Sequence, residues 1–131
     1  YLVSALGTSR TIMGISRFLK RCKPDIKVVS AHPVKGHYIQ GLKNMEEAIV
    51  PAIYDPSRID IQVMVESEEA IAMAREIIVR EGIFAGMSSG AAMVAALKTA
   101  EQIDTGNIVV IFHDRAEKYL STSMFGNLVD Y

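Results

Sequence analysis

The sequence has few of the residues that mark several protein classes. Its 131 residues contain one cysteine, no tryptophan and four prolines. A single cysteine cannot form an internal disulfide, so a disulfide scaffold is excluded and the count fits a reducing compartment such as the cytoplasm. Nine glycines and four prolines are too few for a collagen-like or proline-rich chain.

An excess of charge and a long apolar run are missing as well. Lys and Arg number 14 against 15 Asp and Glu, for a net charge of -1. We therefore expect no nucleic acid partner, because such proteins carry a basic patch. No apolar run approaches the ~20 residues of a membrane span and no basic segment precedes the first apolar stretch, so we expect no membrane partner. The sequence begins at Tyr1 inside an apolar run, which suggests a piece of a longer protein.

Half of the residues are hydrophobic, which is typical of one packed domain and excludes a disordered chain. Hydrophobic periodicity predicts strands at 1–6, 26–31, 59–65 and 108–112, the last buried on both faces, and a short extended piece at 83–85. It predicts helices at 12–23, 67–81 and 91–100, with Ser67 as the N-cap of the second. Residues 32–58 are expected to be irregular apart from a helical turn near Glu46, and residues 113–131 to be mostly loop. This alternation predicts a three-layer, Rossmann-like α/β fold with a mostly parallel sheet flanked by helices.

The first helix carries two further expectations. Its apolar stripe consists of Ile12, Ile15, Phe18 and Leu19, which should face the core. Cys22 lies among basic residues near the end of this helix. Cations could stabilise a reactive thiolate there, but an inert surface residue is favoured because the sequence places no His and Asp pair nearby.

Two small polar loops lead directly into helices, where α/β folds bind their ligands. Residues 7–11, Gly-Thr-Ser-Arg-Thr, combine a permissive Gly7, three hydroxyls and the cation of Arg10, a set suited to a phosphate at a helix N-terminus. The segment is neither a P-loop nor a dinucleotide fingerprint, and an ordinary N-cap cluster explains it equally well. Residues 86–92, Gly-Met-Ser-Ser-Gly-Ala-Ala, have the same architecture. Their serines could bind a ligand or simply cap a tightly packed helix.

Three ordered segments, 7–14, 80–92 and 114–122, together resemble the cysteine synthase family. Its members are fold-type II enzymes that depend on pyridoxal 5'-phosphate (PLP) and catalyse β-replacement; the similarity is greatest to the cysteine synthase B branch. The resemblance implies that residues 1–131 are the C-terminal portion of the large PLP-binding domain, without the N-terminal lysine-bearing and substrate-loop regions. It implies an activated serine and a sulfur donor as substrates, an aminoacrylate intermediate, a homodimer and a cytoplasmic location.

The resemblance also assigns site residues. It implies that the cofactor phosphate is held by Gly7, Thr8, Ser9, Arg10 and Thr11. It implies that Ser88 hydrogen-bonds the pyridine nitrogen, as a neutral hydroxyl that would leave this nitrogen unprotonated, and that Gly41 binds substrate at the active-site entrance. No residue of the chain is assigned as catalytic. His32, His37 and His113 share no metal-ligand spacing, so no metal site is expected. His113 ends a strand and could face the ligand crevice, although a partly exposed loop histidine is favoured.

Some positions depart from the family pattern. Ser9 and Arg10 stand where the family has two glycines, and Ala116 where it often has one. Arg10 could bind the phosphate, fill the place of the cofactor or point to solvent. The alternative is therefore a non-catalytic homologue that binds a phosphorylated small molecule or a partner protein.

The lysine that carries the cofactor in the family belongs to the part upstream of these segments. Seven lysines are present, and none has the desolvated setting that activates a lysine: Lys20, Lys23, Lys27, Lys35, Lys43, Lys98 and Lys118. We therefore expect PLP as the cofactor of the parent protein, and no catalysis by this chain alone.

Overall fold

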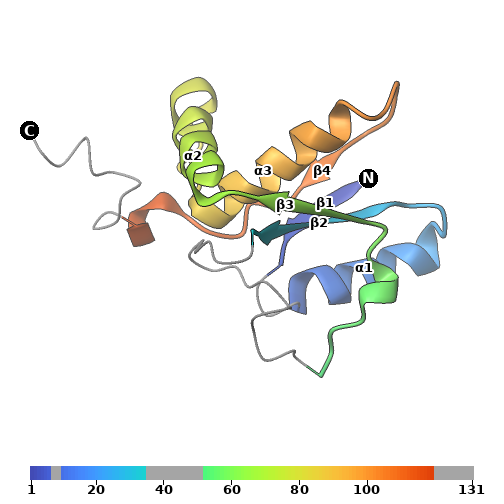
Figure 1. Cartoon of the computed structure of the whole chain (residues 1–131). Helices are drawn as coiled ribbons and strands as arrows, with labels where there is room; N and C mark the ends of the chain where they lie inside the picture. The colour runs from blue at the N-terminus through green and yellow to red at the C-terminus, as the bar shows by residue number, and fades with distance from the viewer. Residues whose placement is uncertain (7–9, 35–51, 120–131) are drawn as a thin grey trace, which may run out of the picture.

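The computed structural model describes residues 1–6, 10–34 and 52–119, which alternate between strands and helices along the chain (Figure 1). The elements follow in the order β1 (Leu2–Ala5), α1 (Arg10–Cys22), β2 (Val28–Pro33), the 3₁₀ turn η1 (Pro56–Arg58), β3 (Ile61–Val65), α2 (Ser67–Glu81), α3 (Met87–Ala100), β4 (Val109–Val110) and the 3₁₀ turn η2 (Ala116–Tyr119). Among these residues no helix has the length and apolar character of a membrane span.

The four strands form one parallel sheet in the order β3-β2-β1-β4. Helices α2 and α3 cover one face of this sheet and α1 lies against the other (Figure 1). The predicted three-layer α/β fold with a parallel sheet is therefore confirmed.

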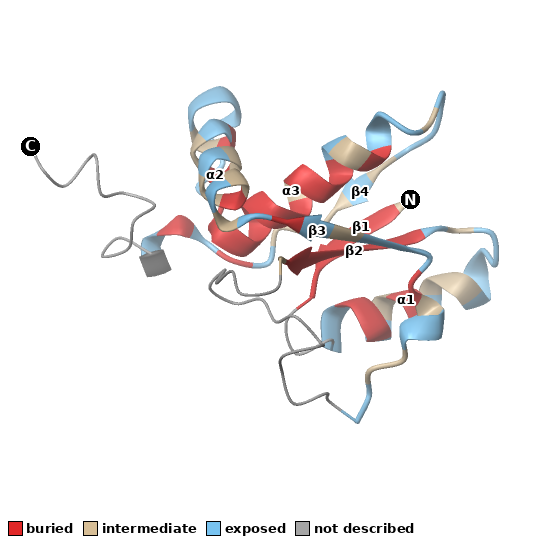
Figure 2. Cartoon of the chain, in the orientation of Figure 1, coloured by how far each residue is buried: buried red, intermediate tan, exposed pale blue. Residues whose placement is uncertain are grey.

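The central strands β1 and β2 are buried along their whole length (Figure 2). Because successive side chains point to opposite faces of the sheet, the core falls into two clusters. Val3, Ala5, Val29 and Ala31 face α2 and α3, and they pack against the alanine-rich side of α3. On the other face of the sheet, a smaller cluster consists of Leu6, Ile12, Met13, Val28 and Ile59. The prediction that Phe18 faces the core is wrong, since Phe18 is 62% exposed and the buried residues of α1 are Ile12, Met13 and Ser16.

The predicted second helix is confirmed, with a different N-cap. Glu66 is the N-cap residue, Ser67 is the first helical residue, and the side chains of Glu66 and Glu69 form a reciprocal capping box. Gly82 ends the helix in the left-handed conformation, at φ 67°, which a residue with a Cβ rarely adopts. Glu66 caps the helix in place of the predicted Ser67 because Glu66 is the last residue with an extended backbone, and the helical backbone already begins at Ser67.

Other boundaries also differ from the predictions. Helix α1 begins at Arg10 rather than Ile12, and β2 runs on to Pro33. The predicted strand at 108–112 is reduced to β4, and its burial on both faces is wrong because Val109 is 60% exposed and Val110 is only partly buried. In the described sheet β4 is an edge strand. The extended piece at 83–85 forms one antiparallel bridge, between Ala85 and Arg115, rather than a strand. The turn expected near Glu46 lies outside the described residues.

A buried polar strip lies beneath α1. Ser30 and His32 alternate onto the face of β2 that carries Val28, and Ser4 of β1 is in register with Ser30. His32 is 3% exposed, and its Nε2 lies 2.6 Å from Ser30 Oγ. Desolvation by burial lowers the pKa of His32, so the imidazole is held neutral in the folded protein.

This burial predicts a loss of stability in mild acid. A histidine whose folded-state pKa lies below its unfolded value of about 6.5 stabilises the fold fully above that pH and loses the contribution as the pH falls. Between pH 7.5 and 5.5, we expect the free energy of unfolding to fall by up to about 1.4 kcal/mol per pH unit through His32. Urea titrations of the protein and of His32→Gln at both pH values measure this change in the free energy of unfolding. An equal decline in the variant would contradict this assignment.

Candidate functional site

Two connections diverge at the carboxyl edge of the sheet. After β1 the chain passes to α1 on one face, and after β4 it passes toward the start of α3 on the other. The starts of α1 and α3 both lie at the edge toward which the strands point (Figure 1). In parallel α/β sheets, ligands bind where neighbouring strands send their connections to opposite faces.

The first turn of α3 is held by a carboxylate from a distant part of the chain. Asp114, 8% exposed, accepts hydrogen bonds from the backbone N–H of Ser88 at 3.1 Å and of Ser89 at 3.0 Å. The Ser89 hydroxyl also donates to the same carboxylate. A carboxylate at a helix N-terminus is stabilised by the free N–H groups and by the helix dipole. The first turn of α3 is therefore fixed to the segment that follows β4.

Backbone contacts extend this attachment. The Gly86 N–H donates to the Asp114 carbonyl at 3.3 Å, and the Ala116 N–H donates to the Phe84 carbonyl at 3.0 Å. Residues 87–90, predicted as loop, are helical, so the predicted start of the third helix at residue 91 is wrong. The helix begins earlier because its capping carboxylate comes from Asp114, which no local sequence signal reveals.

The Ser88 hydroxyl is the buried polar group that this attachment positions. Ser88 is 1% exposed, and its Oγ lies 3.1 Å from Nε2 of His113, whose side chain is largely exposed. A hydroxyl offers one donor and two acceptor positions, so one partner leaves capacity for a ligand atom. The sequence-predicted Ser88 therefore stands at the carboxyl edge with a fixed backbone.

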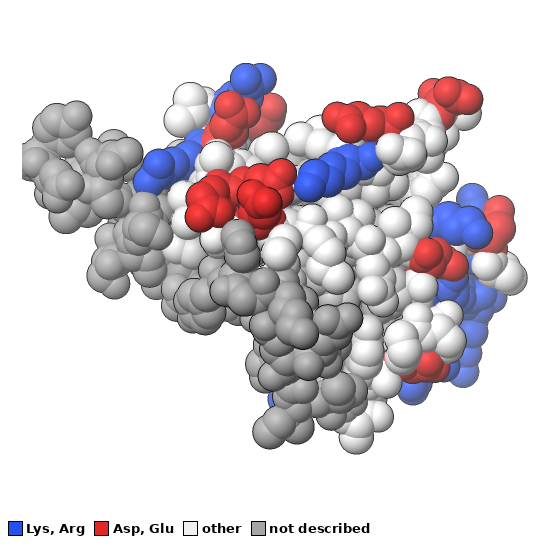
Figure 3. Space-filling model, in the orientation of Figure 1, with Lys and Arg blue, Asp and Glu red and all other residues white. Residues whose placement is uncertain are grey.

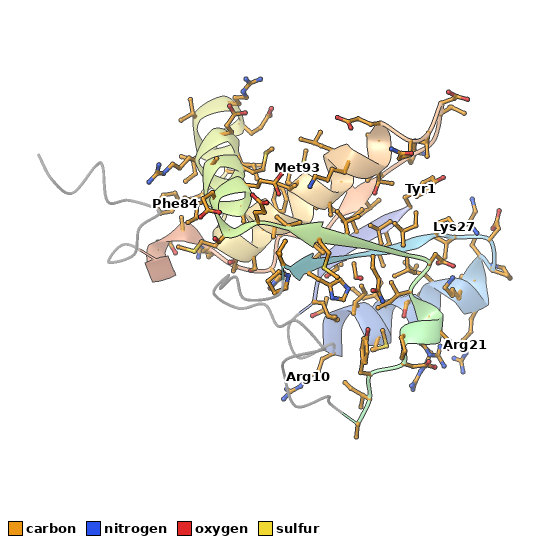
Figure 4. The ribbon with its side chains drawn as sticks, viewed as in Figure 1. Tyr1, Arg10, Arg21, Lys27, Phe84 and Met93 are labelled. Carbon is orange, nitrogen blue, oxygen red and sulfur yellow. The ribbon has the colours of Figure 1, made fainter. Side chains whose placement is uncertain are left out.

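The other predicted site residues are only partly described. Arg10 and Thr11 are the first two residues of α1, both exposed, and Arg10 projects from the helix start away from the sheet (Figure 4). Gly7, Thr8, Ser9 and Gly41 lie outside the described residues. The phosphate-binding prediction for residues 7–11 and the substrate-binding prediction for Gly41 stay predictions.

Two ion pairs elsewhere join separate elements of the fold. Lys20 pairs with Asp60 at 2.8 Å, and Lys98 pairs with Glu69 at 3.4 Å. Acidic and basic side chains are interleaved on the face that Figure 3 shows.

Cys22 is exposed as the last residue of α1, at the position the sequence predicted. In the described part of the chain, no group of three His, Cys, Asp or Glu side chains is placed to hold a metal ion.

An open hollow of about 500 Å³ lies away from Ser88. It is at the amino edge of the sheet, where Tyr1, Lys27 and Asn107 contribute to its lining. Ligands of parallel sheets bind at the opposite edge, so its size does not make it the functional site.

A sequence profile of the family described as "Pyridoxal-phosphate dependent enzyme" matches residues 1–114. The chain belongs to this family. Among the curated relatives of this PLP-enzyme chain is cysteine synthase B of Pseudomonas aeruginosa, 38% identical over 125 residues. Another is cysteine synthase of Aquifex aeolicus, 40% identical over 132 residues. These matches cover 95% and 97% of the chain but 42% and 40% of the relatives, so the chain spans about two fifths of their length.

Solved structures agree with the sequence relatives. The crystal structure of O-acetyl serine sulfhydrylase isoform 3 from Entamoeba histolytica matches with a TM-score of 0.86 and 36% sequence identity. The match covers 95% of this PLP-enzyme chain and 40% of that chain. The resemblance to cysteine synthases and the fold of fold-type II PLP enzymes are therefore confirmed.

Proposed function

We propose that the chain is part of a PLP-dependent cysteine synthase, an O-acetylserine sulfhydrylase that replaces the leaving group of an activated serine with a sulfur nucleophile. Its relatives are cysteine synthases and O-acetyl serine sulfhydrylases that extend well beyond the matched region. The observation that carries the proposal is the buried Ser88 hydroxyl, held at the ligand-binding edge of the sheet by its backbone bond to Asp114.

The chemistry of this edge suits the pyridine ring of PLP. An unprotonated pyridine nitrogen needs a hydrogen-bond donor, and a serine hydroxyl can supply one without giving up its proton. Asp114, the carboxylate that contacts this turn of α3, already accepts hydrogen bonds from the N–H groups of Ser88 and Ser89, so the Ser88 hydroxyl is the group presented to a ligand. When bound, PLP supplies the electron sink that allows the β-substituent of the amino acid to leave.

The phosphate end of the cofactor would lie at the start of α1. The N–H groups of a helix's first turn and the positive end of its dipole attract a phosphate. In this proposal residues 7–9 and Thr11 donate to the phosphate, Arg10 adds a cation, and Gly41 lines the substrate entrance. We expect the 131 residues by themselves to be inactive, because no lysine among them is expected to have the desolvated setting that activates a lysine. Of the described lysines, Lys20 and Lys98 are ion-paired near the C-terminal ends of their helices. The homodimer and the cytoplasmic location remain predictions.

A second candidate is a non-catalytic protein that binds a phosphorylated small molecule or a partner protein. It is favoured by one observation, the exposed cation of Arg10 at the start of α1, where the cysteine synthase family has glycine. Arginine binds phosphate through paired N–H donors and does so without a cofactor. The two candidates differ in whether PLP itself binds.

Titration of the full-length protein with PLP, followed by cofactor fluorescence and by cysteine formation from O-acetylserine and sulfide, separates them. We expect Ser88→Ala to weaken cofactor binding about tenfold, since a buried hydrogen bond to the ring is lost. Ser57→Ala, an exposed serine in η1, is the matched control and should leave binding unchanged. Binding of phosphorylated ligands without binding of PLP would reject the synthase and favour the second candidate.

A further inference from the structure

The Ser88 hydroxyl has a partner to which the proposed function gives no role, the imidazole of His113. The distance from Ser88 Oγ to His113 Nε2 is 3.1 Å, across 25 residues of sequence. We propose that His113 is a positioning residue that donates a hydrogen bond from Nε2 to Ser88 and so directs the serine proton toward the pyridine nitrogen. This inference rests on the proposed function.

The protons of the pair allow two alternative directions for this hydrogen bond. Serine has one hydroxyl proton, so it can donate to His113 or to a ligand, but not to both. If Nε2 lacks a proton, Ser88 donates to it and offers a ligand only lone pairs, which suits a protonated ring nitrogen. If Nε2 carries the proton, Ser88 accepts from it and donates outward, which suits an unprotonated one. The tautomer of His113 therefore sets which form of the ring Ser88 favours.

The surroundings of Ser88 fix its backbone and leave only the direction of its O–H bond to change. Its backbone is fixed by the N–H bond to Asp114, and Asp114 directly follows His113, so both partners are carried by one anchored segment. Ser88 is 1% exposed, so bulk water competes little for its hydroxyl. A chain of two hydrogen bonds in the same direction polarises each member, which strengthens the bond from Ser88 to the ring.

One test reads the tautomer directly. Nitrogen-15 NMR of the full-length protein labelled at histidine, with His113 assigned by comparison with His113→Gln, shows which ring nitrogen carries the proton. We expect the proton on Nε2 of His113, both before and after PLP is added. A proton on Nδ1 alone would overturn the inference, because Ser88 would then have to donate to His113.

A double-mutant cycle on PLP affinity tests the coupling. We expect His113→Leu to weaken PLP binding about threefold to tenfold, the size of one hydrogen bond, and His113→Gln, which keeps an N–H donor, to stay within about twofold. In a Ser88→Ala background His113→Leu should cause no further loss. Arg115→Gln, exposed in the same segment, is the matched control and should bind PLP normally.

The outcomes separate this inference from the function it rests on. Normal PLP binding by His113→Leu, or an equal loss in the Ser88→Ala background, would overturn the role of His113 while leaving the cofactor assignment intact. Failure of the unmodified protein to bind PLP would overturn both.

Discussion

Replacing Gly90 with alanine is expected to lower the free energy of unfolding by about 3 kcal/mol. A Cβ at this position would lie 2.9 Å from the Ala74 nitrogen and 3.0 Å from the Ala74 Cβ, with the Ala70 carbonyl oxygen closer still. Two of these three atoms belong to the backbone of α2, so no side-chain rotation relieves the overlap. Helices α2 and α3 would have to separate, which would loosen the larger core cluster. The midpoint of a urea titration measures the effect.

Gly14 provides the matched control, because it is also a helical glycine. A Cβ there meets no atom within 4 Å, and Gly14 is exposed on α1. Gly14→Ala should raise stability by about 0.5–1 kcal/mol, since alanine favours the helix and does not disturb the packing. Equal stability of the two variants would contradict the close approach of α2 and α3 at Gly90.

Replacing Asp114 with alanine is expected to lower the free energy of unfolding by about 3 kcal/mol and to weaken PLP binding. The carboxylate accepts from the N–H groups of both Ser88 and Ser89 and from the Ser89 hydroxyl. Without it, buried donors in the first turn of α3 lose their partner, and Ser88 is no longer held in place. Urea titration measures the first effect, and fluorescence titration with PLP measures the second.

Asp114→Asn sharpens this experiment. In the native protein each carboxylate oxygen of Asp114 accepts from one backbone N–H. Asparagine keeps one acceptor oxygen, but its NH₂ group takes the place of the other and would face a backbone N–H as donor against donor. We therefore expect a loss of about half that of alanine, and Asp104→Asn, an exposed aspartate before β4, should be neutral. If Asp114→Ala unfolds at the same urea concentration as Asp104→Asn, then Asp114 does not cap α3.

The sequence predicted the elements whose signals are local. The β-branched run of β2, the apolar alternation before Val65 and the stripe of α2 each mark their element, and together they predict the parallel three-layer fold. Ser88 was predicted as a site residue because small residues precede a helix there and because that segment resembles the cysteine synthases.

Features that depend on distant residues were not predictable in the same way. The start of α3 is fixed by Asp114, which lies 26 residues from Ser88, so the local pattern places the helix start too late. The run at 108–112 is apolar whether its strand is central or at an edge, and only the strand order shows that β4 is an edge. For His113 a partly exposed loop position was favoured over one facing the ligand crevice; it is exposed, and its contact with Ser88 is visible only in the structure.

In the proposed function Ser88, at the carboxyl edge of this sheet, faces the pyridine nitrogen of PLP. The most direct measurement is a crystal structure of the full-length protein grown with PLP. We expect a distance of about 2.6–3.2 Å between Ser88 Oγ and the ring nitrogen, with the phosphate at the start of α1. A ring bound at another place, or one whose nitrogen is far from Ser88, would contradict it.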